Sequence, residues 1–143
     1  YGARGTLLGI TRGTSRAHIV RAVLEGIAHR GADMVDASQD DSGLTIDSIR
    51  IDGGMSRNPT FVQALANASQ RTIEVSPVTE ATTLGAAFLA GVAVGTWKSL
   101  PEAVSTWSPA VVVAPNKALD RAQWNEALNR ASGWIPELSA LDF

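Results

Sequence analysis

The sequence predicts an α/β layer structure. Short apolar runs with strand-like alternation are interleaved with longer segments whose apolar residues recur at helical spacing. One of these strands leads through two glycines directly into a predicted helix. Hydrophobic residues make up 45% of 143 residues, which is enough for the core of one domain. In this class of fold, ligands are expected at the carboxyl ends of the strands.

The first third of the chain predicts a strand, a long helix and a loop. Residues 5–10 form a probable strand, and Thr14 or Ser15 is placed to cap a helix over residues 16–38. Residues 39–47 form an acidic loop. The expected apolar face of the long helix carries Ile19, Val20, Val23, Ile27, Met34 and Val35.

Four further elements follow. Residues 49–52 predict a strand, residues 59–69 a helix, and residues 72–76 a strand that Pro77 ends. Residues 82–97 predict a helix rich in glycine and alanine. Since glycine costs about 1 kcal/mol in a helix interior, this composition favours close packing of the helix on a sheet. The alternative is that its first turn, over residues 79–85, lines a ligand cleft.

The last third predicts three elements. Residues 101–107 form a short helix, residues 110–114 an apolar strand, and residues 119–134 an amphipathic helix. Four tryptophans are expected to be packing anchors rather than platforms for sugar stacking, because such platforms need exposure. They are Trp97, Trp107, Trp124 and Trp134.

The segment IRIDGGMSRNP, residues 49–59, carries the most chemical information. Gly53 and Gly54 follow the strand, and Asn58 and Pro59 suit the N-cap and first position of the next helix. Two residues without Cβ atoms let a ligand approach the backbone closely. The helix start supplies free N–H groups and a partial positive charge that favour phosphate. The same arrangement also occurs as a plain tight turn.

Composition narrows the classes of function. The net charge of −2 shows no basic excess, which argues against nucleic acid or an anionic membrane as a partner. The absence of cysteine excludes disulfides and thiolate metal sites. No apolar run is long enough to span a bilayer. Because the chain starts at Tyr1 rather than at methionine, we expect it to come from the middle of a larger protein.

Three segments form ordered blocks along the chain: RGTLLGITRGTSRAHIVRAVLEGIAH, IRIDGGMSRNP and TEATTLGAAFLAGVAVGTW. They resemble consecutive blocks of the carboxyl-terminal domain of the FGGY carbohydrate kinases. The first block matches the family's second signature through Gly5, Leu7, Gly9, His18, Ile19, Ala22, Leu24 and Glu25. The resemblance covers about residues 3–115, and the ITRGTSRAHI and LGAAFLAGVAVGTW stretches are closest to the bacterial members that phosphorylate glycerol.

The resemblance implies a ribonuclease H-like fold of the actin-like ATPase type. Two lobes of that architecture close over ATP and a polyol or sugar. Residues 1–143 are then the carboxyl-terminal, nucleotide-binding lobe, a mixed sheet flanked by helices, without its upstream portion. The resemblance also implies a cytoplasmic enzyme that is a homo-oligomer at full length.

The family's adenosine motif corresponds to the strand, diglycine and helix described above. Gly53 and Gly54 are implied to bind the nucleotide, with the backbone of Gly54 near the α-phosphate and ribose. Asn58 is implied to contact the base. ATP and Mg²⁺ are the implied cofactors. The catalytic aspartate, the β- and γ-phosphate loops and most polyol contacts are implied to lie upstream, so this chain has no assigned catalytic residue or metal ligand.

Other polar residues have weaker functional interpretations. Asp52 could act as a base, but hydrogen bonding to the turn backbone is the expected role. His18 and His29 lie eleven residues apart on one helix without a carboxylate pair, so we expect surface or hydrogen-bonded histidines. A loose basic stripe is expected to be a solvated face or subunit contact rather than a phosphate site; its members are Arg12, Arg16, Arg21 and Arg30.

Three functions are therefore compared. The favoured one is the ATP-binding part of a kinase that converts glycerol to sn-glycerol 3-phosphate, with this segment inactive alone. The first alternative is a kinase for another polyol or sugar of the same family, which the upstream sequence would decide. The second is an actin-like nucleotide-binding or assembly module without transferase activity, which glycerol-dependent ADP release would exclude.

Overall fold

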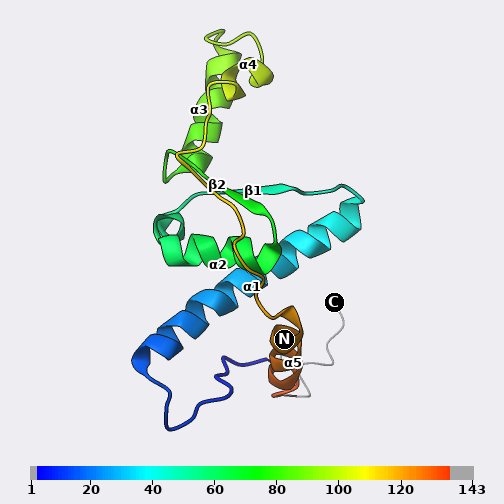
Figure 1. Cartoon of the computed structure of the whole chain (residues 1–143). Helices are drawn as coiled ribbons and strands as arrows, with labels where there is room; N and C mark the ends of the chain where they lie inside the picture. The colour runs from blue at the N-terminus through cyan, green and yellow to red at the C-terminus, as the bar shows by residue number, and fades with distance from the viewer. Residues whose placement is uncertain (1–2, 136–143) are drawn as a thin grey trace.

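The computed structural model describes residues 3–135 and has the predicted α/β class. Figure 1 shows a small sheet in the middle of the molecule, with helices on one side of it and at both ends. The elements in chain order are α1 (Arg16–Ser42), β1 (Ser48–Ile51), the 3-10 helix η1 (Gly54–Arg57), α2 (Pro59–Ser69), β2 (Thr72–Val75), α3 (Ala81–Ala93), α4 (Leu100–Val104), β3 (Val111–Val113) and α5 (Arg121–Ser132).

The sheet is mixed, with strand order β1-β2-β3. Strand β1 runs parallel to β2, with Ser48 opposite Thr72, and β3 runs antiparallel to β2. Ile73 in the central strand is fully buried. Within the part of the chain that the structure describes, β1 pairs only with β2, so its other edge has no partner strand.

The core lies between the sheet, α2 and α1. Helix α2 covers one face of the sheet. Helix α1 crosses α2 on the side of α2 that faces away from the sheet (Figure 1). The approach of the two helices is close at Gly31, where an added Cβ would lie 3.0 Å from Leu65 Cδ1. The buried apolar residues are Ala28, Ala32, Phe61, Val62, Ala64, Leu65, Ala66, Ala68 and Ile73.

Helix α1 is longer than predicted and buries a different face. It begins after Ser15, whose side chain and that of His18 form a capping box, and it ends at Gly43 with φ +67°. The helix continues through the aspartates at positions 40 and 41, and Gly43 then adopts the left-handed conformation of a C-cap. The α1 residues in the core cluster are Ala28 and Ala32, and Leu24 packs against them. The predicted face is largely exposed at Ile19, Val20, Val23, Ile27 and Met34.

The predicted strand over residues 5–10 is wrong. This segment has no regular secondary structure, and the side chains of Leu7, Leu8 and Ile10 are about half exposed. Alternation alone does not make a strand, since a strand needs a neighbour to accept and donate its backbone hydrogen bonds. Here Leu8 and Gly9 lie against α5 instead of against the sheet.

The expected packing of the small-residue helix on the sheet is also wrong. Helix α3 buries none of its residues and extends away from the sheet together with α4 (Figure 1). One glycine does have a packing reason, because a Cβ on Gly91 would clash with the ring of Trp97. That ring in turn makes an edge contact with Phe88.

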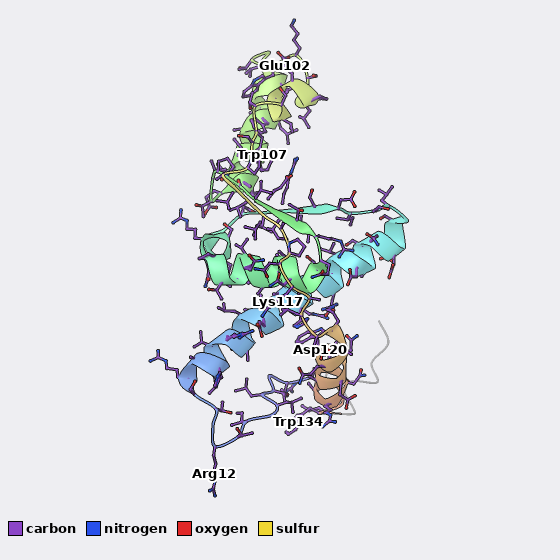
Figure 2. The ribbon with its side chains drawn as sticks, in the orientation of Figure 1. Arg12, Glu102, Trp107, Lys117, Asp120 and Trp134 are labelled. Atoms are coloured by element: carbon purple, nitrogen blue, oxygen red, sulfur yellow. The ribbon has the colours of Figure 1, made fainter. Side chains whose placement is uncertain are left out.

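The tryptophans divide between packing and exposure. Trp124 stacks on His29, and Arg50 lies 4.3 Å from the ring centroid of Trp107, beside the base of α3 (Figure 2). Trp134, in contrast, is 67% exposed, so its expected role as an anchor is wrong. No helix among residues 3–135 combines the length and apolarity needed to cross a bilayer.

We expect the isolated 143-residue chain to self-associate. The unpaired edge of β1 offers free backbone groups, and the exposed apolar row on α1 offers a surface for association. Sedimentation velocity at low and high concentration should show a mass that increases with concentration. A monodisperse monomer at both concentrations, with a cooperative melt, would contradict this expectation.

Candidate functional site

The diglycine turn lies where β1 ends and the chain enters η1. Gly53 has φ +83° and ψ −178°, a conformation that is essentially restricted to glycine. A Cβ built on Gly53 or on Gly54 would meet no heavy atom within 4 Å. The space beside both residues is therefore open, and the two glycines leave the backbone accessible from that side.

Hydrogen bonds join this turn to the loop between β2 and α3. The backbone N–H of Gly53 donates to Thr79 O at 3.0 Å, and the Arg57 guanidinium donates to Thr79 Oγ1. Within the turn, Ser56 Oγ donates to Gly53 O at 2.7 Å. The ends of the parallel strands β1 and β2 are thus held together at one edge of the sheet, where ligands of α/β folds bind.

Asp52 bonds to backbone, as predicted, but not within its own turn. Its Oδ2 accepts a hydrogen bond at 3.0 Å from the backbone N–H of Ala81, the first residue of α3. A carboxylate at a helix N-terminus is favoured by the partial positive charge there. This contact gives Asp52 a structural role in fixing α3 to the end of β1.

Asn58 is the N-cap of α2, and Pro59 follows at the first position, as the sequence predicts. Its Oδ1 accepts from the backbone N–H of Thr60 at 3.0 Å and of Phe61 at 3.2 Å. Among the described residues, its Nδ2 has no hydrogen-bond partner. Asn58 can therefore cap the helix and still donate two hydrogen bonds to a ligand.

We expect Asn58→Ala to have two separable effects in the full-length protein. Loss of the cap should cost about 1 kcal/mol of stability, which thermal unfolding measures. If the free amide donates to a nucleotide base, the KM for ATP rises while the KM for the phosphoryl acceptor stays the same. Asn58→Ser keeps a capping oxygen but lacks the amide, so it should restore stability and not the KM for ATP. Unchanged ATP kinetics in both variants would leave Asn58 with the capping role alone.

A cavity of about 600 Å³ opens beside this junction. Its apolar walls come from α2, β2, β3 and the loop after β2, at Pro59, Val62, Val75, Pro77, Val111 and Val113. Its polar groups belong to Ser56, Arg57, Gln63, Ser76 and Thr79. A mostly apolar cavity with a few polar groups is the usual form of a small-molecule site, and its volume suits one.

The sequence analysis did not identify Gln63 as a site residue, and it included Thr79 only in the alternative that residues 79–85 line a ligand cleft. Gln63 shares a face of α2 with Pro59, four residues earlier, and this spacing was the available signal. Thr79 reaches the site through the loop after β2, and its contact with Arg57 depends on how two loops meet. No short motif predicts such a contact.

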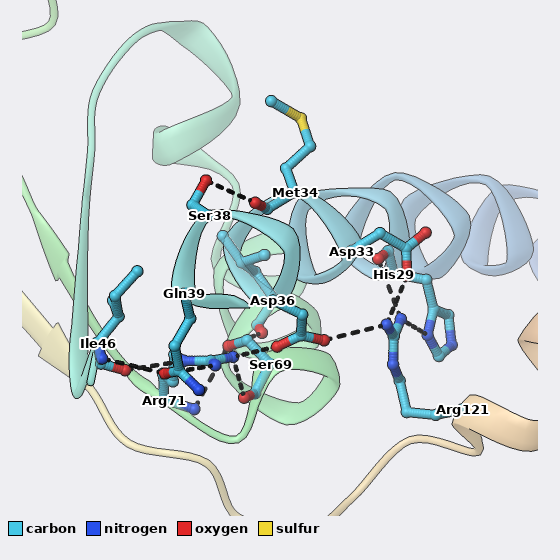
Figure 3. A network of polar contacts seen from close by, with 11 residues as sticks. His29, Asp33, Met34, Asp36, Ser38, Gln39, Ile46, Ser69, Arg71 and Arg121 are labelled. Atoms are coloured by element: carbon cyan, nitrogen blue, oxygen red, sulfur yellow. Dashed lines mark hydrogen bonds and ion pairs between the residues drawn. The ribbon is translucent and has the colours of Figure 1, made fainter. Parts of the chain in front are cut away.

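A second polar cluster ties α5 to α1, away from the cavity (Figure 3). Arg121 donates to Asp33 and to the backbone oxygen of His29, and the Trp124 indole donates to Asp33 Oδ2 at 3.0 Å. The His29 ring stacks on Trp124 with centroids 5.0 Å apart. On the same face of α1, Arg71 forms an ion pair with Asp36 at 2.8 Å. His29 thus serves packing in this cluster, while His18 lies in the helix cap.

The environment shifts two pKa values in this cluster. Burial lowers the pKa of His29, and the nearby charge of Arg121 lowers it further, against the opposing effect of Asp33. For Asp33, burial alone would raise the pKa, but hydrogen bonds from Trp124 and Arg121 outweigh it and the pKa is lowered. The cluster is therefore built for neutral His29 and ionised Asp33.

We expect acidification to weaken this cluster through His29. Below the unfolded value of 6.5 the unfolded chain takes up a proton that the folded His29 resists, so stability falls as the pH falls through that range. His29→Phe keeps a ring against Trp124 and removes the titrating group. Its free energy of unfolding should therefore decline less between about pH 7 and pH 5. Parallel pH profiles for the two full-length proteins would contradict this assignment.

The basic stripe does not form a site. Arg21 pairs with Glu25 at 2.8 Å and Arg30 with Asp33 at 3.5 Å, while Arg12 projects outward from the loop before α1 (Figure 2). Across residues 3–135 there is no group of three His, Asp or Glu side chains that could hold a metal ion. Of the predicted nucleotide-binding residues, Gly53 and Gly54 lie directly after β1 and Asn58 is the N-cap of α2; none of the three lines the cavity.

Comparison with known proteins gives consistent matches. The glycerol kinase of Clostridium beijerinckii is 41% identical over 140 residues, which are 94% of this chain and 28% of that protein. The crystal structure of Plasmodium falciparum glycerol kinase with ADP matches with a TM-score of 0.73 and 34% identity, over 99% of this chain and 28% of that one. Gluconate kinase from Lactobacillus acidophilus matches with a TM-score of 0.70 and 26% identity, over 97% and 28% of the two chains.

The matches show how much of each relative the chain covers and to which family it belongs. The chain spans about 28% of the length of the relatives that it matches. The profile of the carboxyl-terminal domain of one family covers residues 1–94, which is well over half of the sequence. The fold, the relatives and this profile agree, and the chain belongs to the FGGY family of carbohydrate kinases, within its carboxyl-terminal domain.

Proposed function

We propose that this chain is the ATP-binding part of a glycerol kinase. The observation that carries the proposal is the junction of β1, η1 and α2. There Gly53 and Gly54 are open on one side, and Asn58 has a free amide. Their chain neighbours Ser56, Arg57 and Pro59 line a cavity of about 600 Å³. Glycerol kinases of 41% and 44% identity over most of the chain support this assignment of substrate.

The geometry suggests how each part would act. The backbone at Gly54 lies open to the α-phosphate and ribose, since no side chain or neighbouring atom blocks it. The Asn58 amide offers donors to the acceptor nitrogens of a purine. The amino-terminal end of α2 adds a partial positive charge that favours the phosphates.

The full reaction needs groups beyond this segment. Phosphoryl transfer moves the γ-phosphoryl group of ATP to a glycerol hydroxyl, whose proton passes to a base, and ADP is released. We place Mg²⁺ on the ATP phosphates, where it would neutralise the charge that develops during transfer. We assign the base and the glycerol contacts to the parts of a full-length kinase that this chain does not cover.

A coupled assay of the full-length protein tests the proposal. ADP formation from ATP should depend on glycerol, and xylulose and gluconate at equal concentration should support far less turnover. A strong preference for xylulose or gluconate over glycerol would establish that the protein is a kinase for another substrate of the family. ATP binding without turnover on any acceptor would establish a nucleotide-binding module that is not a transferase.

A further inference from the structure

The amide of Gln63 has its orientation fixed by backbone groups. Its Nε2 donates to Asn67 Oδ1 at 3.1 Å and to Ala114 O at 3.0 Å. Asn67 Oδ1 also accepts from the backbone N–H of Asn116 at 3.0 Å. Because a backbone N–H can only donate, Asn67 must present its oxygen to this loop. Gln63 must therefore present its NH₂ group to both acceptors.

This arrangement leaves Gln63 with one free polar atom. Both N–H groups of its amide are used, and Oε1 has no hydrogen-bond partner among the described residues. The half-buried side chain lines this cavity together with Pro59 and Val62, and it also lines a second cavity beside Asn67 and Lys117. Toward a ligand that reaches Oε1, Gln63 is an acceptor that cannot turn into a donor without breaking two hydrogen bonds.

We propose that Gln63 determines the base specificity of this site by accepting a hydrogen bond from the 6-amino group of a purine. This inference rests on the proposed function, since it assumes that the cavity takes the base of the nucleotide. The apolar walls formed by Val62, Val75 and Val111 suit a flat heterocycle. Adenine carries a 6-amino donor, whereas hypoxanthine and guanine carry a 6-oxo acceptor at the same place.

The fixed amide explains why discrimination would be strong. A freely rotating glutamine could turn its NH₂ group toward a 6-oxo purine and accept either base. Here the NH₂ group is committed to Asn67 and Ala114, so a 6-oxo base brings two acceptors face to face. A purine without any 6-substituent only leaves the Gln63 oxygen without a partner, which is a smaller loss.

The test compares three nucleotides on the full-length kinase by calorimetric titration: ATP, purine riboside triphosphate and inosine triphosphate. We expect affinity to fall in that order, by about threefold to tenfold for the missing amino group and by more than about tenfold for the oxo group. Equal affinity for ATP and inosine triphosphate would overturn the proposal.

Two variants locate the effect. Gln63→Met removes the acceptor and should reduce the preference for ATP over inosine triphosphate to within about threefold. Gln70→Met is the matched control, because Gln70 Nε2 also donates to backbone oxygens, of Asn67 and Lys117, but its side chain does not line the cavity. It should keep the wild-type preference. Circular dichroism confirms that each variant is folded.

The outcomes separate this inference from the proposed function. Wild-type discrimination that persists in Gln63→Met overturns the role of Gln63 while the nucleotide site stands. If the wild-type protein binds none of the three nucleotides, the proposed function fails and this inference fails with it. Should Gln63→Met not fold, the order of the three nucleotides on the wild-type protein decides the question.

Discussion

Gly54→Val is expected to weaken ATP binding by the full-length kinase by more than about tenfold, with little change in melting temperature. Gly54 has no positive φ, and a Cβ built on it meets no protein atom within 4 Å. The protein therefore has room for the side chain. The two methyl groups of valine would instead occupy the space in which we place the ribose and α-phosphate.

Gly53→Ala provides the contrasting variant. Its backbone, with φ +83° and ψ −178°, is accessible essentially only to glycine, so alanine should cost about 1–3 kcal/mol of stability. The Gly53 N–H bond to Thr79 O would be strained at the same time. Chemical denaturation and ATP titration on both variants distinguish a folding defect from a binding defect.

The two glycines thus predict opposite patterns. Gly54→Val should lose affinity and keep its fold, whereas Gly53→Ala should lose stability first. If Gly54→Val binds ATP as tightly as the wild type, the open side of Gly54 faces solvent only and the diglycine is a structural turn.

The second large effect is complete loss of turnover when the 143-residue chain is produced alone. The chain spans about 28% of the length of the glycerol kinases it matches. Phosphoryl transfer needs the acceptor, its base and the triphosphate positioned in line. A coupled assay on the purified chain should give the same rate with and without glycerol.

The full-length protein, assayed in parallel, is the control for that experiment. It should show glycerol-dependent ADP formation under the same conditions. Glycerol-dependent turnover by the isolated chain would show that a complete catalytic set lies within these 143 residues, contrary to our assignment.

Local sequence signals predicted the bounds of α2, which begins beside the candidate site. Helix α2 begins and ends as predicted, because Asn58 and Pro59 give an N-cap signal that needs no tertiary context. From residue 16 onward, the order of strands and helices followed from hydrophobic periodicity, which is also a local signal. Of the two adjacent glycines, Gly53 has a positive φ and Gly54 does not, and the sequence alone did not distinguish them.

Features that depend on distant contacts were not predictable. The buried face of α1 is the one with small residues, because close approach to α2 at Gly31 matters more there than side-chain hydrophobicity. The segment over residues 5–10 alternates like a strand but has no strand beside it in the described structure. The orientation of Gln63 depends on Ala114, which is 51 residues away in the sequence.

The most direct test of the central claim is a crystal structure of the full-length protein with a non-hydrolysable ATP analogue. We predict that the α-phosphate and ribose lie against the backbone of Gly54, with the base toward the cavity between α2 and β2 and the Asn58 amide within hydrogen-bond distance of it. A nucleotide bound elsewhere, with the junction of β1, η1 and α2 empty, would contradict the account.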